Sequence, residues 1–452
     1  MTQAAEPELH EPDAAMVRRA VFASAIGNAV EWYDYGVFTA GAITGVVGTI
    51  FFPGDQGGTA VLKSLALVAV GFIVRPFGGA FWGPLGDKVG RRVVLAATIL
   101  IMSGCTFLVG VLPTYAAIGI AAPVLLLLLR VIQGFSTGGE YGGAATCIAE
   151  FAPTKRRGFF GSFLEFGTLS GYVLGQVVVL AVVATCTSAQ LSAWGWRIPF
   201  LIALPLGLVG LYLRTRLEET PTFKLQERNG QRPDHAPLRE TLFGNWKMIL
   251  NLIGIVILLN VADYMLLTTM PSYFTQYLHV SDTESGLIII GVELAQMALI
   301  APLGALSDRI GRKPLLLASA IGFVVLSYPA IKLMQMGNIF TLILGFAIVA
   351  FLLLLILAVI GSTFPAMFPT RVRYGSFAIG YNISTSLFGG TTGVVVVALI
   401  NATGDKDIPA YYLIAAGLIG LLPILLIPET ARVPMSKISA DRKQTALAAE
   451  PV

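Results

Sequence analysis

The sequence predicts an all-α membrane protein with twelve transmembrane helices arranged as two six-helix bundles. Three observations support this prediction: the chain is very apolar, its apolar residues fall into twelve long runs, and a polar loop of the first half returns in the second. Of the 452 residues, 55% are hydrophobic and 12% are charged, and the mean hydropathy is +0.77. A soluble domain carries about twice that share of charged residues.

The apolar runs have the length that a membrane-spanning helix needs, roughly 20 residues. They lie at 19–48, 60–82, 93–112, 117–148, 159–187, 196–216, 247–275, 284–306, 314–334, 339–367, 372–400 and 409–428. The short alternating pattern of membrane β-strands is absent from the sequence, so each run is predicted to be a helix.

Lysine and arginine gather in alternate connections between these runs. They are frequent at the N-terminus, in every second loop and in the C-terminal tail. The loops without them lie near 50–59, 113–116, 276–283 and 335–338. The positive-inside rule therefore places both termini in the cytoplasm. The net charge of +4 reflects this bias and gives no indication of nucleic-acid binding.

A ten-residue polar loop occurs twice. Residues 83–92 read GPLGDKVGRR and residues 304–313 read GALSDRIGRK, and each stretch lies between two apolar runs. Three further matches occur in the same order in both halves: 28–31 with 260–263, 153–157 with 369–373, and 218–221 with 428–430. The chain is therefore predicted to be six helices repeated in parallel.

This repeat divides the chain into five predicted parts. They are a cytoplasmic N-terminal tail (1–17), a first bundle (18–216), a cytoplasmic linker (217–245), a second bundle (246–428) and a cytoplasmic tail (429–452). A monomer is expected.

Charged side chains inside two apolar runs are candidate functional residues. Glu31 and Asp34 share one face of the first helix, and Arg130 shares a face of the fourth with Gln133 and Glu140. A charge at membrane depth is expensive and marks a transport pathway by default. Burial favours a neutral carboxyl group and an adjacent arginine favours the charged form. We expect Asp34 or Glu31 to carry a proton while Arg130 alternates between that acid and a solute carboxylate; the alternative is a fixed ion pair.

The two polar loops are predicted to gate the pathway. Asp87 and Asp308 are expected to accept hydrogen bonds from free N–H groups at the start of the next helix. Arg91 and Arg312 are expected to pair with acids on neighbouring helices. Such contacts would close the cytoplasmic side in one state and break in the other. The alternative is that these charges only set the topology.

Several motifs indicate a family. Both polar loops resemble the conserved loop of the major facilitator superfamily, and 130–134 resembles its Arg-x-x-Gln-Gly motif. Four further stretches are similar to the metabolite:proton symporter family within it: 27–36, 75–79, 138–141 and 194–200. Three more are most similar to its proline/betaine transporters: 217–221, 270–273 and 388–392. The resemblance covers about 18–432 and implies the major facilitator fold, a bacterial plasma-membrane location and proton-coupled symport.

The aromatic residues suit the solute that this resemblance implies. A quaternary ammonium group has no N–H to donate and is held by aromatic faces. Trp32 and Tyr35 flank the acids of the first helix, and Tyr264 adjoins Asp263 in the seventh. The candidate solute-binding residues are Trp32, Tyr35, Gln133, Glu140, Asp263 and Tyr264. The alternative is that the rings only pack or lie at the membrane interface.

The expected function is uptake of a zwitterionic solute together with H⁺. The alternatives are a proton-coupled carrier of a carboxylate such as α-ketoglutarate or shikimate, and an exporter of cationic compounds. An enzyme is not expected, because the sequence has no His-Glu-x-x-His, Gly-x-Ser-x-Gly or phosphate-binding motif. No metal and no cofactor are expected either. Arg75 precedes Pro76 and is predicted to lie near the cytoplasmic end of its helix, where it can reach the membrane surface.

Overall fold

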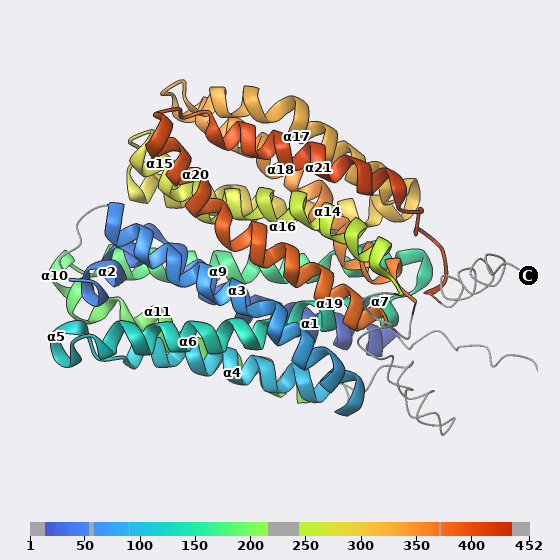
Figure 1. The fold of residues 1–452 in the computed structure, drawn as a ribbon, viewed down its shortest axis with the longest axis horizontal. Coiled ribbons are helices and arrows are strands. Elements are labelled where there is room, and N and C mark those ends of the chain that lie inside the picture. The colour runs from blue at the N-terminus through green and yellow to red at the C-terminus, as the bar shows by residue number, and fades with distance from the viewer. Residues whose placement is uncertain (1–13, 54–57, 90, 216–243, 370–371, 436–452) are drawn as a thin grey trace, which may run out of the picture.

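The computed structural model describes residues 14–435 except 54–57, 90, 216–243 and 370–371. The described residues form helices joined by short connections, with no β-strand among them. Figure 1 shows two groups of helices, the first half of the chain below and the second half above. The predicted linker, apart from 244–245, and most of both predicted tails lie outside the described residues.

The first half forms six spans, several of them built from two helices. They are α1 (Ala14–Thr39) with α2 (Gly41–Phe51), α3 (Gly58–Val89), α4 (Arg91–Val111), α6 (Ala121–Thr137) with α7 (Glu140–Phe151), α8 (Arg157–Gly161) with α9 (Phe163–Thr185), and α11 (Arg197–Thr215). Short turns connect them: α5 (Tyr115–Ile118), η1 (Thr154–Arg156), α10 (Ser188–Gln190) and η2 (Leu191–Gly195). The bend between α1 and α2 is 71°.

The second half repeats this plan. Its spans are α14 (Trp246–Tyr264) with α15 (Met270–Gln276), α16 (Asp282–Ile310), α17 (Lys313–Met334), α18 (Ile339–Thr363), α19 (Arg373–Ser384) with α20 (Gly390–Thr403), and α21 (Ile408–Leu426). The π-helical turns η3 (Met265–Thr269) and η5 (Thr385–Gly389) join the paired helices, and η4 (Pro365–Met367) follows α18.

The predicted fold class is confirmed. Among the described residues, ten helices are long and apolar enough to cross a membrane, and the bent pair of α1 and α2 adds an eleventh. The remaining predicted span corresponds to α3, a helix of 32 residues. It continues beyond the apolar run that predicted it, into the first copy of the polar loop.

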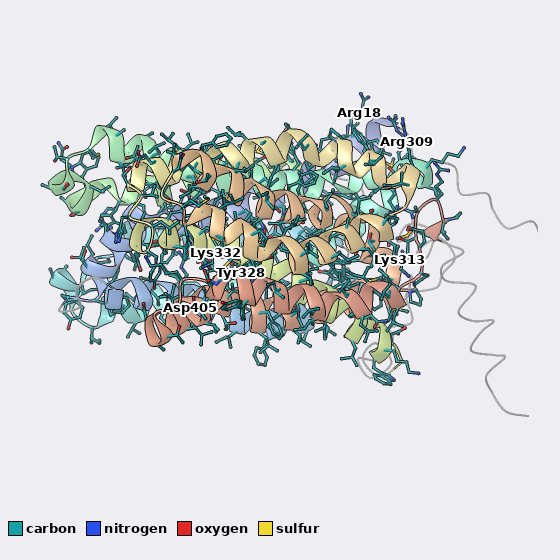
Figure 2. The ribbon with its side chains drawn as sticks, turned by 90° about the horizontal axis from the view of Figure 1, so that it is seen from above. Arg18, Arg309, Lys313, Tyr328, Lys332 and Asp405 are labelled. Atoms are coloured by element: carbon teal, nitrogen blue, oxygen red, sulfur yellow. The ribbon has the colours of Figure 1, made fainter. Side chains whose placement is uncertain are left out.

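The two ends of the molecule differ in charge. Figure 2 shows Arg18, Arg309 and Lys313 toward one end, and Lys332 and Asp405 toward the other. We call the first the basic end and the second the opposite end. The prediction that the basic end faces the cytoplasm rests on the positive-inside rule.

Glycines let α3 approach α6 closely. A Cβ atom added at Gly134 would lie 1.9 Å from the carbonyl oxygen of Gly71, and one added at Gly78 would lie 1.9 Å from that of Phe135. Real Cβ atoms do not come this near to a backbone oxygen, so any larger residue must push the helices apart. Small residues of this kind are typical of helix contacts in membranes. The glycines of the motifs at 75–79 and 130–134 therefore have a packing role.

We expect Gly134→Ala to destabilise the protein by about 1–3 kcal/mol, the usual cost of overpacking a tight contact. Thermal unfolding of the purified protein in detergent measures this effect. Gly104→Ala is the matched control, because no atom lies within 4 Å of a Cβ added at Gly104 in α4. Equal unfolding temperatures for the two variants would contradict the close contact.

Candidate functional site

Helix α1 carries two buried acids that turn toward different helices. Glu31 and Asp34 are 2% and 1% exposed. Glu31 faces Arg75 of α3, whereas Asp34 faces Arg130 of α6. Close packing of α1 on α9 holds this helix in place, since a Cβ atom at Gly171 would lie 2.0 Å from the Ala29 carbonyl oxygen.

The pair of Asp34 and Arg130 lies wholly within the first half. Nη1 of Arg130 lies 2.5 Å from Oδ2 of Asp34 and donates to Oε1 of Gln133 at 2.9 Å. Gln133 in turn donates to Thr106 of α4 at 2.7 Å, and the guanidinium lies 4.0 Å from the ring centre of Phe38. Within the described residues, Oδ1 of Asp34 and Nη2 of Arg130 have no hydrogen-bond partner. The pair is therefore buried, with a single direct contact.

The pair of Glu31 and Arg75 lies where the two halves meet. Nη2 of Arg75 lies 2.7 Å from Oε1 of Glu31 and also donates to the Tyr35 hydroxyl at 2.7 Å. The guanidinium lies 4.5 Å from the ring centre of Phe72. Tyr264 of the second half is within its electrostatic reach. Arg75 is 3% exposed, so the prediction that it reaches the membrane surface is wrong.

Four aromatic rings form a cluster between the halves. Trp32 lies 5.3 Å from Tyr35 and 6.0 Å from Tyr264, measured between ring centres. Phe72 lies 5.5 Å from Tyr35 and 5.0 Å from Tyr264. We call Trp32, Tyr35, Phe72 and Tyr264 the ring cluster. It brings together three of the predicted solute-binding residues.

Three acids that have no basic partner among the described residues interact with one another, and one of them, Asp263, directly precedes Tyr264 of this cluster. They are Asp263 of α14, Glu165 of α9 and Glu293 of α16, all at most 6% exposed. Glu165 and Glu293 lie close enough to Asp263 to interact with it electrostatically. Glu165 accepts a hydrogen bond of 2.5 Å from Tyr141. No lysine, arginine or histidine of the described residues forms an ion pair with any of the three.

The remaining predicted solute-binding residues, Gln133 and Glu140, lie elsewhere. Gln133 supports Arg130 as described above. Glu140 lies 2.5 Å from Nη2 of Arg214, which comes from α11. The Arg214 guanidinium packs directly against Gly27: a Cβ atom added at Gly27 would lie 1.7 Å from Nη2 of Arg214. The structure thus places Glu140 in an ion pair inside the first half, outside the ring cluster but within electrostatic reach of Glu31 and Arg75.

Sequence reasoning missed two tyrosines of the site. Tyr381 of α19 stacks on Tyr141 of α7 with ring centres 4.2 Å apart, so this contact joins the two halves. Arg75, Glu165 and Asp263 are all within electrostatic reach of Tyr381. Tyr141 belongs to the motif at 138–141, which could have identified it; Tyr381 lies in no motif.

Asp308 joins the two halves at the basic end. Its carboxylate accepts hydrogen bonds from the backbone N–H groups of Gly158 at 2.7 Å and Phe159 at 2.9 Å, both in α8 of the other half. Glycines allow this approach, since a Cβ atom at Gly304 would lie 2.7 Å from the Gly158 carbonyl oxygen. A second bridge joins Arg373 of α19 to Glu150 of α7 at 3.2 Å. The halves are therefore joined at this end.

These contacts differ from those predicted for the polar loops. The N–H groups that begin α17 donate to Glu429, at 3.0 Å from both Arg312 and Lys313, and so are not available to Asp308. The Arg312 guanidinium, just before α17, donates to the carbonyl of Ser362 and to Thr430, and lies 3.9 Å from Asp308 of α16. Burial lowers the pKa of Arg312 to about 10. The side chains of Asp87 and Arg91 lie outside the described part of the structure.

A small cavity marks the interface of the two halves toward the opposite end. A cavity of about 70 Å³ lies between them there, lined in part by Gln176 and Val179 of α9 and by Thr275 and Ile289 of the second half. The two halves thus meet at the basic end and have a cavity between them at the other.

Comparison with known proteins identifies the family. Residues 20–240 match the family described as sugar (and other) transporter, and residues 252–450 match the major facilitator superfamily. Over 431 residues the chain is 43% identical to the glycine betaine/proline/ectoine/pipecolic acid transporter OusA of Dickeya dadantii, covering 94% of this chain and 85% of that protein. It is 42% identical to the proline/betaine transporter of Escherichia coli K12, with 94% and 86% covered.

Solved structures show the same fold. The proton:xylose symporter XylE aligns with a TM-score of 0.78 at 18% identity, covering 95% of this chain and 99% of that one. The inward-open conformation of XylE from E. coli aligns with a TM-score of 0.67 at 20% identity, covering 94% and 99%.

Two helical halves with buried charges and rings between them define a membrane transporter and not an enzyme. The chain belongs to the major facilitator superfamily and, within it, to the same family as the proline/betaine transporters. It is a multi-pass protein of the bacterial plasma membrane that moves a small-molecule solute. The resemblance expected from the motifs is confirmed.

Proposed function

We propose that this chain imports a small zwitterionic solute of the proline and betaine kind together with a proton, acting as a monomer by alternating access. The names of the relatives support the solute class. The observation that carries the proposal is the ring cluster between the halves, with Arg75 on one side and unpaired acids near it. A zwitterion needs one cation for its carboxylate and aromatic faces or acids for its ammonium group.

The proton would be carried by Asp34. This acid is buried, has one cationic partner and retains one oxygen without a partner among the described residues. A carboxyl group in such surroundings can exchange between a charged, paired form and a neutral form. Among the described residues, Arg130 contacts Asp34, Gln133 and Phe38, all of the first half, so a change in this pair would alter how α1, α4 and α6 pack together. Glu31, which Arg75 likewise holds through one oxygen, is the other candidate.

Alternating access would use the contacts at the basic end. The hydrogen bonds of Asp308 and the ion pair of Arg373 with Glu150 would hold that end closed, and they would break as the halves rock apart. Because the polar loop is repeated, Asp87 and Arg91 of the first half would likewise form contacts that close the basic end. Arg312 would hold the loop that follows Asp308 in place.

Uptake by proteoliposomes tests the solute class. Labelled proline, betaine and α-ketoglutarate are supplied to the purified, reconstituted protein at several concentrations. The proposal expects saturable uptake of proline or betaine, and α-ketoglutarate should neither enter nor compete. Transport of α-ketoglutarate alone would favour a carboxylate carrier. Outward movement of organic cations without uptake of zwitterions would favour an exporter, which the three unpaired acids would suit.

A further inference from the structure

The buried arginines Arg75 and Arg130 have different surroundings, and only Arg75 faces the second half. Arg130 is enclosed by residues of α1, α4 and α6. Arg75 shares its helix face with Phe72 and Gly79, which are three residues before it and four after it. The Phe72 carbonyl accepts a hydrogen bond from Ser386 of the second half. A Cβ atom added at Gly79 would lie 2.9 Å from Asn382 of α19. Arg75 therefore lies between two contacts of α3 with the second half.

Arg75 has hydrogen-bonding capacity that its present partners leave unused. A guanidinium group carries five N–H donors in a planar fork that matches a carboxylate. Both hydrogen bonds of Arg75 come from Nη2, and Nε has no partner among the described residues. Glu31 is likewise held through one oxygen, and its Oε2 has no partner there. Arg75 could therefore release Glu31 and bind another carboxylate, and Glu31 could then bind another cation.

An arginine and an acid come from the two halves that meet at the ring cluster. Arg75 lies on the side of the first half, and Asp263 lies in α14 of the second. Tyr264 and Tyr381 are each within electrostatic reach of both Arg75 and Asp263. A small solute with a negative and a positive end would find a counter-charge for each end, and aromatic faces between them.

We infer that Arg75, and not Arg130, receives the solute carboxylate, and that Glu31 is the counter-ion that the solute displaces. The ammonium end then lies against Trp32 and Tyr264 and points toward Asp263. This assignment rests on the proposed zwitterion transport and specifies which charged side chains recognise the solute. In it, Glu31 competes with the solute for Arg75, whereas the pair of Asp34 and Arg130 stays intact on binding.

Binding of betaine and choline to purified variants tests this assignment. The two ligands share the trimethylammonium group, but only betaine has a carboxylate. Arg75→Gln should weaken betaine binding about ten- to a hundredfold, because a charge-assisted contact is lost. Choline binding should change little, so the preference for betaine should disappear. Arg75→Lys keeps the charge without the fork and should give an intermediate preference for betaine.

Glu31→Gln is the second variant, and it separates binding from packing. Without its competing carboxylate, Arg75 should bind betaine as tightly as before or more tightly. If the pair of Glu31 and Arg75 only held α1 and α3 together, each single variant would weaken the binding of betaine and of choline equally. The double variant would then restore the binding of both ligands. We expect instead that the double variant binds betaine no more tightly than choline. Thermal unfolding of each variant reports whether it is folded.

The outcomes distinguish this inference from the proposed function. If the unmodified protein binds neither betaine nor proline, the proposed solute class is wrong. If it binds betaine and Arg75→Gln keeps the full preference over choline, the role of Arg75 is wrong and zwitterion transport still stands. If Arg75→Gln does not fold, Glu31→Gln decides. Loss of both betaine and choline binding in Glu31→Gln would overturn the inference.

Discussion

Asp34→Asn should abolish accumulation of solute against a gradient and leave exchange of solute across the membrane. Asparagine keeps an oxygen that can accept the hydrogen bond of Arg130, which lies 2.5 Å from Asp34 in the native protein. It cannot take up or release a proton, so the halves could still alternate around bound solute, but no proton gradient would drive them. The buried Arg130 would lose its counter-charge, and removal of one partner of such a pair costs about 3–5 kcal/mol.

Two assays on the same proteoliposomes measure this effect. Accumulation of labelled betaine is driven by an imposed pH gradient, and exchange is followed with unlabelled betaine inside and no gradient. Asp407→Asn is the matched control, because Asp407 pairs with Lys332 at 2.6 Å toward the opposite end and away from the ring cluster. Such partly exposed pairs contribute about 0–1 kcal/mol. Unchanged uphill accumulation by Asp34→Asn would exclude Asp34 as the proton carrier.

Asp308→Asn should open the basic end and slow turnover while solute affinity stays close to normal. The native carboxylate accepts two backbone N–H groups of the other half, at 2.7 and 2.9 Å. The asparagine side chain has one oxygen and one NH₂ group, so it can accept only one of these two hydrogen bonds. Loss of a charge-assisted hydrogen bond costs about 2 kcal/mol, which corresponds to roughly a thirtyfold shift toward the open form.

Thiol labelling at the basic end measures that shift. Cys105, Cys147 and Cys186 are first replaced, and a single cysteine is introduced at Ser362, a buried residue close to Gly161 of the first half. Maleimide should modify this cysteine faster in the Asp308→Asn background than in the unmodified or Asp407→Asn background. An equal labelling rate, or a defect confined to affinity, would argue against a gating role for Asp308.

The sequence contained enough to predict the spans, the repeat and the meeting of α1 with α6. Hydropathy and loop charge report where a helix crosses the membrane, and residue spacing reports which side chains share its face. Asp34 and Arg130 could therefore be predicted as partners, because each lies on the polar face of its helix.

The depth of Arg75 could not be read from hydropathy. Hydropathy predicts that the second apolar run ends at residue 82, which places Arg75 near the membrane surface. Helix α3 in fact continues to Val89, because the polar loop that follows is itself helical. Arg75 is therefore about two helical turns further from the helix end than predicted.

Pairings between distant segments were also beyond the sequence. Spacing shows that Glu140 faces inward, but it does not show that Arg214 of α11 reaches it through the space above Gly27. In the same way, Glu429, which lies after the last helix, accepts hydrogen bonds from the N–H groups that were predicted to donate to Asp308. Such contacts depend on tertiary packing and leave no local pattern.

Proton entry together with betaine distinguishes a proton-coupled symporter from a sodium-coupled one. Proteoliposomes that contain the purified protein are placed in sodium-free buffer with an imposed pH gradient, alkaline inside, and labelled betaine is supplied outside. We expect betaine to accumulate above its external concentration and protons to enter with it, recorded by a pH-sensitive dye inside the vesicles. Accumulation that requires a sodium gradient and proceeds without proton entry would contradict it.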